Sequence, residues 1–217
     1  MKNVTLVQMG PLVPNFDLEK VRHMANKAQK VFTFTVGDQI TTVGSTDRDE
    51  QYKFNDLSQT LKQRSEEDIN VLIGVIDSKI HNELYSGVDG DNQLIIVSLA
   101  DIRNMLQLSR KGYNDYVLCE IGAQLLAIEY RRIRSISFDP EECGVPWHEE
   151  TLSCLFDYDE NRDHTYKKLM SPKLCAKCKA LLAEANVGMS VQTACVNIVK
   201  AGLRPVGSAL QETFHNV

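Results

Sequence analysis

Residues 69–77, INVLIGVID, form the most apolar strand-forming stretch of the chain. Its apolar residues do not alternate with polar ones, and this pattern indicates burial on both faces. A strand of this kind is typical of the centre of a layered α/β sheet, because helices cover both of its sides. We therefore expect this segment to be the central strand, with the rest of the fold arranged around it.

Segments with strand and helix patterns flank this stretch. The expected strands are residues 3–13, 32–44 and 92–102, the last of them after a turn at residues 87–91, GVDGD. The expected helices are residues 18–32 with Asp17 as cap, residues 57–67 with a start at Asn55 or Asp56, and residues 113–132, 179–186 and 191–203. This order predicts an α/β (α+β) fold in which helices pack on a mixed sheet.

Composition limits the class of protein. Of the 217 residues, 43% are hydrophobic, and no stretch approaches the roughly eighteen apolar residues of a membrane span, so we expect a soluble protein. The N-terminal segment lacks the pattern of a signal peptide, which favours a reducing, cytoplasmic setting. The formal net charge is −5 and no basic block is present, which argues against a nucleic-acid partner.

The strongest chemical signal is the pair Cys175 and Cys178, separated by two residues. Two thiolates at this spacing can bind one tetrahedral ion from a tight turn. Cys154 lies upstream, beyond a charged loop with little apolar material to hold it in place. In a reducing setting, six cysteines favour metal binding or burial over disulfides. We therefore expect one structural zinc ion per chain, bound by these three cysteines and a fourth ligand.

Three residues are candidates for the fourth zinc ligand. His148 is preferred, because neutral imidazole binds zinc well and its position gives the order H-x5-C-x20-C-x2-C. Cys143 could replace it if the intervening loop folds back, and His164 is the third candidate.

The zinc motif divides the chain into three expected parts. These are a core at residues 1–142, a zinc-binding lobe at residues 143–182 and a C-terminal helical extension at residues 183–217. The extension contains an amphipathic helix, whose apolar side we expect to dock on the parent domain. Binding to a partner protein is the alternative use of that side.

Several phrases resemble the archaemetzincins, a family of small zincins with an HExxH catalytic helix and a cysteine-based structural zinc site. In family order they are DEQYKFNDLSQTL (residues 49–61), NVLIGVIDSKI (70–80), LIIVSLADI (94–102), VLCEIGAQLLAIEYR (117–131), CLFD (154–157) and LCAKCKALL (174–182). The resemblance covers about residues 1–182. It implies a small zincin-like core, in which a mixed sheet is packed with helices, and a structural zinc site at the cysteines.

The resemblance breaks at the catalytic helix. A metzincin helix carries HExxHxxGxxH, in which two histidines one turn apart bind the metal and the glutamate is the general base. The five aligned positions here are Cys119, Glu120, Ala123, Leu126 and Glu129. Only the glutamate is retained, and alanine cannot bind a metal. We therefore expect an archaemetzincin-like pseudoenzyme that has lost its catalytic metal and serves as a scaffold for a protein or peptide partner.

The alternative hypothesis is an active metal-dependent hydrolase with an unconventional site. Glu120 would act as general base, and Cys119 and Glu129 would bind the metal together with one more distant donor. The candidates for that donor are Gln124, His148 and His164.

The same residues also have purely structural interpretations. Cys119 lies close to the apolar stripe of its helix, which favours burial over catalysis. A salt bridge from Glu120 to Arg103 or Arg110 would satisfy a carboxylate near that stripe. The charged residues at the end of the helix are expected to form a solvated face, and these are Glu129, Arg131, Arg132 and Arg134.

Overall fold

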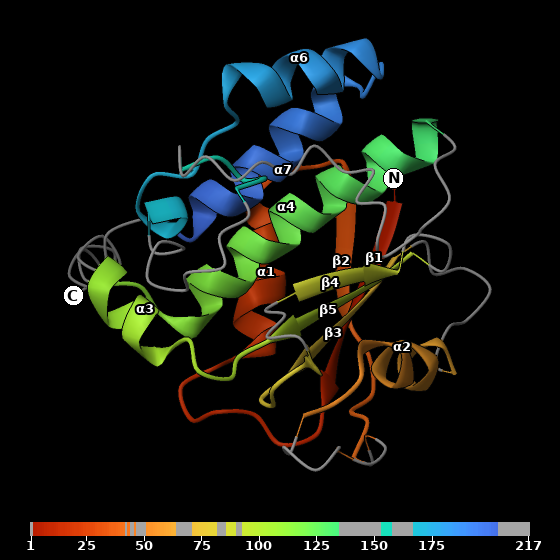
Figure 1. Ribbon diagram of the computed structural model, residues 1–217, viewed down its shortest axis with the longest axis vertical. Helices are drawn as coiled ribbons and strands as arrows, with labels where there is room; N and C mark the ends of the chain where they lie inside the picture. Colours follow the sequence, from red (N-terminus) through yellow and green to blue (C-terminus); the bar gives the residue numbers. More distant parts are fainter. Residues whose placement is uncertain are drawn as a thin grey trace, which may run out of the picture.

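A computed structural model describes residues 2–41, 43, 46, 51–63, 71–81, 86–89, 93–134, 153–157 and 167–203. Its centre is a five-stranded sheet with the strand order β2-β1-β3-β5-β4 (Figure 1). The strands are β1 (Lys2–Met9), β2 (Phe32–Val36), β3 (Val71–Ile76), β4 (Ser86–Asp89) and β5 (Leu94–Ser98). All neighbours in the sheet are parallel except β4, which runs antiparallel to β5. The predicted mixed α/β sheet is confirmed.

Strand β3 lies in the middle of the sheet, as its sequence predicts. It pairs with β1 on one side and β5 on the other, and all six of its residues are buried. Helices therefore cover both faces of the sheet, which explains why β3 lacks the alternation of a half-exposed strand. Gly74 leaves room for the side chain of Met9, which a Cβ atom at this position would overlap.

Helices cover the two faces unequally (Figure 1). On one face, α1 (Leu18–Ala28), α4 (Tyr113–Arg134) and α7 (Met189–Ala201) pack together and form the larger apolar core with the sheet. On the other face, α2 (Phe54–Lys62) covers a smaller core against β3 and β5.

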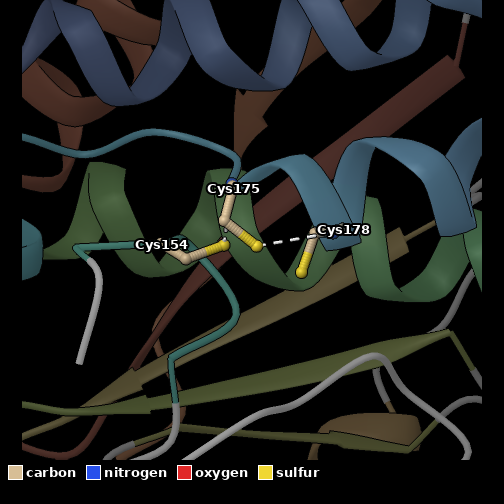
Figure 2. A group of neighbouring side chains, drawn as sticks. All are labelled: Cys154, Cys175 and Cys178. Carbon is tan, nitrogen blue, oxygen red and sulfur yellow. Dashed lines mark hydrogen bonds between the residues drawn. The ribbon is translucent and has the colours of Figure 1, made fainter. Parts of the chain in front are cut away.

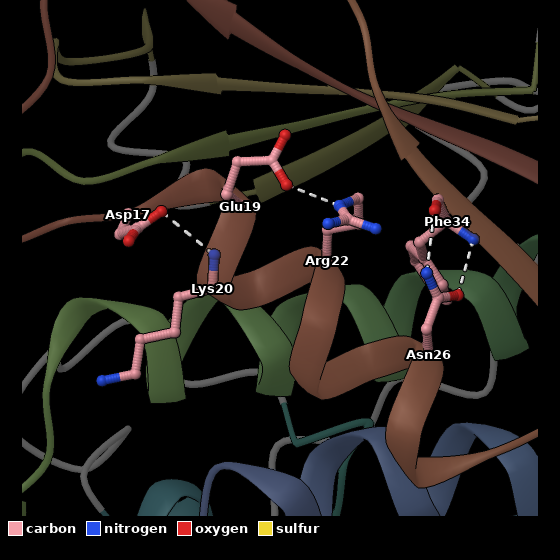
Figure 3. A network of polar contacts seen from close by, with 6 residues as sticks. All are labelled: Asp17, Glu19, Lys20, Arg22, Asn26 and Phe34. Carbon is pink, nitrogen blue, oxygen red and sulfur yellow. Dashed lines mark hydrogen bonds and ion pairs between the residues drawn. The ribbon is translucent and has the colours of Figure 1, made fainter.

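Helix α1 is fixed at both ends by side-chain hydrogen bonds (Figure 3). Asp17 caps its first turn by accepting a hydrogen bond from the Lys20 backbone N–H at 3.0 Å, as predicted. Near the other end, Asn26 bonds both backbone groups of Phe34 on β2, at 2.9 and 2.8 Å. These two hydrogen bonds set the position of α1 along the edge of the sheet.

Helix α4 runs through the middle of the larger core. Every residue from Tyr116 to Arg131 is buried, because the sheet covers one side of the helix and α7 covers another. Gly122 allows the close approach of α7, since a Cβ atom there would lie 2.9 Å from the Cys195 carbonyl oxygen and would overlap Val199. The C-terminal helix thus docks on the parent domain, as expected.

The apolar core also includes residues of the expected zinc lobe. Cys154, Phe156, Leu169 and Cys178 are buried in the same cluster as the residues of α1, α4 and α7. Helix α6 (Ala176–Glu184) begins directly after Cys175, includes Cys178 and contributes Leu182 to that cluster. The three-part division of the chain stays a prediction, with a core that is continuous across both proposed boundaries.

Several local expectations differ from the structure. Residues 86–89 form strand β4, although a turn was expected at residues 87–91, because pairing with β5 extends this glycine-containing segment. Helix α3 (Arg103–Ser109) was not anticipated, since seven residues are too few to give a clear helical period. Helix α2 begins at Phe54, before the expected Asn55 or Asp56. In the described part of the chain, no helix combines the length and apolar character needed to cross a membrane.

Candidate metal centre and the buried glutamate

Three cysteines meet beside the first turn of α6 (Figure 2). The Sγ atoms of Cys154, Cys175 and Cys178 all lie within 4.8 Å of one another. Cys175 is the N-cap of α6, and Cys178 follows one turn later on the same helix. Cys154 arrives from a separate segment, whose backbone pairs with Lys173 just before the helix. The sequence prediction that these three cysteines gather in space is confirmed.

Backbone N–H groups surround the sulfur atoms. The N–H of Cys175 donates to the Cys154 Sγ, and the N–H of Cys178 donates to the Cys175 Sγ, both at 3.4 Å. Asp157 fixes the Cys154 backbone by accepting its N–H at 2.7 Å. Ser153 adopts a positive φ of 61° immediately before Cys154. The local backbone is therefore shaped to present the sulfur atoms to one point.

The chemistry of this cluster fits a zinc ion. Zinc in structural sites is bound by thiolates at about 2.3 Å in a tetrahedron, which requires sulfur atoms a few ångströms apart. A hydrogen bond with Cys154, together with burial and the neighbouring Cys175, raises the pKa of the Cys178 thiol above its ordinary value. The Cys178 thiol therefore resists ionising by itself, and a divalent cation would stabilise it as a thiolate.

The candidates for the fourth ligand cannot be placed on this geometry. His148, Cys143 and His164 all lie outside the described residues. Zinc as the metal is supported by three sulfur ligands of suitable spacing. The completion of the shell by His148 stays a prediction.

A second group of polar residues surrounds Glu120 in the middle of α4. Glu120 is 4% exposed, and Lys168 donates to its Oε1 at 3.2 Å. Ser86 on β4 donates to Oε2 at 2.5 Å, and Gln124 donates in turn to the Ser86 hydroxyl at 2.8 Å. Both oxygens of the carboxylate are thus occupied by side chains from other parts of the chain.

Glu120 forms an ion pair, as predicted, but its partner is not one of the expected arginines. Arg103 and Arg110 were the expected counter-ions, whereas the ion pair is formed by Lys168 from a helical turn at residues 167–170. Burial lowers the pKa of Lys168. The charge of Glu120, with smaller contributions from Cys119 and Asp157, outweighs burial and raises the pKa above its ordinary value, so the amine is charged at neutral pH. No sequence motif marks Lys168 or Ser86, because their contact with Glu120 exists only in the folded chain.

Cys119 is buried beside this ion pair. It is 2% exposed, and burial, with the nearby charge of Glu120, raises the pKa of its thiol to about 12 although Lys168 opposes the shift. A thiol with such a pKa is neutral at physiological pH and is a poor metal ligand and nucleophile. The structural interpretation of Cys119 as a core residue is therefore confirmed.

Glu129 does not belong to a solvated face, which corrects the sequence interpretation. Glu129 and Arg131 are 5% and 6% exposed, because α4 is covered on several sides. Glu129 forms ion pairs with Lys2 on β1 and with Arg132, the latter at 3.2 Å. Helix α4 is continuous from Tyr113 to Arg134, so the ten residues from Cys119 to Glu129 rise by about 15 Å. These two side chains cannot bind the same ion.

Comparison with known proteins supports the fold. An archaemetzincin from Methanopyrus kandleri aligns with 85% of this chain and 94% of its own, with a TM-score of 0.55 and 14% identity. A zinc-dependent peptidase from Methanocorpusculum labreanum aligns with 82% of this chain and 99% of its own, with a TM-score of 0.51 and 12% identity. No protein-family model and no curated protein matches the sequence. The predicted archaemetzincin-like fold is confirmed, and the alignment of α4 with the HExxHxxGxxH motif stays a prediction.

Proposed function

We propose that this chain is a zinc-binding pseudoenzyme with an archaemetzincin-like fold, whose metal is structural and whose sheet edge binds a protein or peptide. The observation that carries the proposal is the environment of Glu120. A general base must reach a metal-bound water, but Glu120 is 4% exposed and both of its carboxylate oxygens accept hydrogen bonds, from Lys168 and Ser86. In this arrangement the carboxylate serves as an internal counter-ion.

The rest of α4 supports the loss of a catalytic metal. A catalytic zinc ion needs three protein ligands and an open position. One turn after Cys119, the helix carries Ala123, which has no ligand atom, and Glu129 is paired with Lys2 and Arg132. Among the described residues, the group that can hold a metal ion is the cysteine cluster.

Cys154, Cys175 and Cys178 would hold the zinc ion, and one further ligand would complete its shell. A bound zinc ion at such a site contributes to folding and closes all its coordination positions with protein ligands. The three cysteines would then tie the segment at residues 153–157 to the start of α6. This bond would stabilise a part of the chain that includes Lys168.

The binding role is supported by the position of β4. This strand is the last in the sheet and, in the described part of the chain, pairs with β5 alone. The last strand of a sheet can take up an extended peptide through backbone hydrogen bonds. Ser86, at the first residue of β4, is half-buried and joins this edge to Glu120.

The first experiment is to measure zinc per chain in protein purified without added metal, in the wild type and in the Cys175→Ser and Cys119→Ser variants. We expect one zinc ion in the wild type, a loss in the Cys175 variant and no change in the Cys119 variant. A second ion that depends on Cys119 would contradict the proposal and favour the hydrolase with Glu120 as base. Absence of zinc from reconstituted wild-type protein would also contradict it.

The second experiment tests the edge of the sheet. A pool of random extended peptides would be titrated into isotope-labelled protein while backbone amide signals are followed by NMR. Binding should shift the signals of β4 first. Shifts that spare β4 and gather elsewhere on the protein would refute this site.

A further inference from the structure

A series of polar groups runs from the cysteine cluster toward the edge of the sheet. It begins at Cys154, whose backbone N–H is held by the Asp157 carboxylate at 2.7 Å. The negative charge of Asp157 in turn favours the charged form of Lys168 and raises its pKa, after the larger effects of burial, which lowers it, and of Glu120. The metal-binding segment therefore acts on the amine of Lys168 through charge, and Lys168 itself is in contact with Glu120.

Lys168 then reaches across to α4 and the sheet. Its amine lies 3.2 Å from Glu120 Oε1, and Ser86 of β4 bonds the other oxygen at 2.5 Å. The side chains of Lys168 and Glu120 are only 8% and 6% exposed. A buried charge that loses its partner is strongly destabilised. The position of Lys168 therefore affects both Glu120 and the strand that Glu120 holds.

Lys168 is positioned by the chain between the metal-binding cysteines. It lies between Cys154 and Cys175 in sequence, on the helical turn at residues 167–170. The neighbouring Leu169 is buried in the larger core, whereas Met170 is 56% exposed. The chain that follows this turn is joined to the Cys154 segment by backbone hydrogen bonds, such as the one that the Lys173 N–H donates to the Ser153 carbonyl oxygen at 3.1 Å.

We propose that Lys168 couples the metal-binding cysteines to strand β4, so that loss of the metal releases Lys168 from Glu120 and loosens the peptide-binding edge. The inference rests on the proposed zinc site and adds a mode of regulation to it. With the cysteines joined, Lys168 stays paired and β4 is held through Ser86. With the cysteines separated, Glu120 lacks its counter-ion, and the edge of the sheet opens locally.

The experiment follows lysine labelling and amide exchange with and without a zinc chelator. Amine-reactive labelling, read by mass spectrometry, compares Lys168 with Lys177, which is exposed on α6. Before chelation, Lys168 should react at least about tenfold more slowly than Lys177, because it is buried and paired. After chelation, the two rates should become similar, and amide exchange in β4 and β5 should accelerate by about tenfold or more.

Two controls make the result decisive. Amides of β1 and β3 should stay protected, because global unfolding on chelation would overturn a local coupling. In the Lys168→Met/Glu120→Gln double variant, which removes both charges together, chelation should leave exchange in β4 unchanged. A response of this variant equal to that of the wild type would overturn the role of Lys168.

Metal content measured on the same samples separates the two proposals. Zinc that is present and removable, with Lys168 protected throughout, would overturn the coupling and leave the zinc site standing. Protein that never binds zinc would overturn both.

Discussion

The amine of Lys168 lies 3.2 Å from Glu120 Oε1, although the two residues are 48 positions apart in the sequence. The pair joins the segment between the metal-binding cysteines to the central helix α4 in the buried core. Because desolvation makes a buried ion pair costly, the contribution of this pair depends on both partners being present. Its energetics can therefore be separated by removing the charges singly and together.

Lys168→Met should destabilise the protein strongly. It leaves the Glu120 carboxylate buried without its counter-ion, a change that costs about 3–5 kcal/mol in other proteins. Adding Glu120→Gln should recover much of this loss, because the buried charge is then removed. The measurement is the free energy of unfolding in urea, at pH 7 and with zinc present. Lys177→Met, at an exposed position of α6, serves as control and should change it by less than about 0.5 kcal/mol. Strictly additive effects in the double variant would contradict the pairing.

Gly122→Ala should also destabilise the protein, contrary to the usual effect of alanine in a helix. The new Cβ would lie 2.9 Å from the Cys195 carbonyl oxygen and would overlap Val199, so α4 and α7 must move apart. Overpacking of this kind costs about 1–3 kcal/mol, whereas helix propensity alone would gain about 1 kcal/mol.

Thermal denaturation of the Gly122 variant checks this result. Each 1 kcal/mol corresponds to a fall of about 2–4 °C in Tm for a chain of this size. The control is Gly112→Ala, where the nearest atom outside the chain neighbours is Asp115 Oδ2 at 3.8 Å. An unchanged or higher Tm for Gly122→Ala would show that α7 does not pack on α4 as described.

Much of the scaffold could be predicted from local sequence, and the contacts between distant segments could not. The unbroken apolar run of β3 and the paired cysteines of α6 are signals carried by neighbouring residues. Strand β4 was missed because glycine and aspartate favour turns, and only pairing with β5 extends them. Lys168 gave no signal as the partner of Glu120, since tertiary packing alone brings it there. The burial of Glu129 was missed for the same reason, because the lysine that pairs with its charge, Lys2, comes from strand β1.

Alkaline pH should destabilise the wild type more than a Cys119→Ala variant. Burial, with the charge of Glu120, raises the pKa of the Cys119 thiol from 9.0 to about 12, although Lys168 opposes the shift. Between these values the folded protein keeps a proton that the unfolded chain releases, so rising pH favours unfolding. Below pH 9 the thiol is neutral in both states and has no effect.

Unfolding free energies at pH 8 and pH 10.5 test this linkage. Between them, the wild type should lose about 2 kcal/mol more than the alanine variant, at roughly 1.4 kcal/mol for each pH unit above the ordinary pKa. The comparison of slopes cancels the cost of the small cavity and the titration of other groups. Parallel pH profiles would mean that Cys119 ionises as readily in the folded protein as in the unfolded chain.

Asp157→Ala should weaken zinc binding without removing a zinc ligand. The Asp157 carboxylate accepts the Cys154 N–H at 2.7 Å and so holds the backbone that presents the Cys154 sulfur. Loss of a partner that orients a ligand commonly lowers metal affinity by about 10-fold to 100-fold. Competition with a chromogenic chelator gives the affinity directly. Asp157→Asn keeps an oxygen acceptor in the same place and should retain most of the affinity. If the alanine variant binds zinc as tightly as the wild type, the Cys154 sulfur is positioned without help from Asp157.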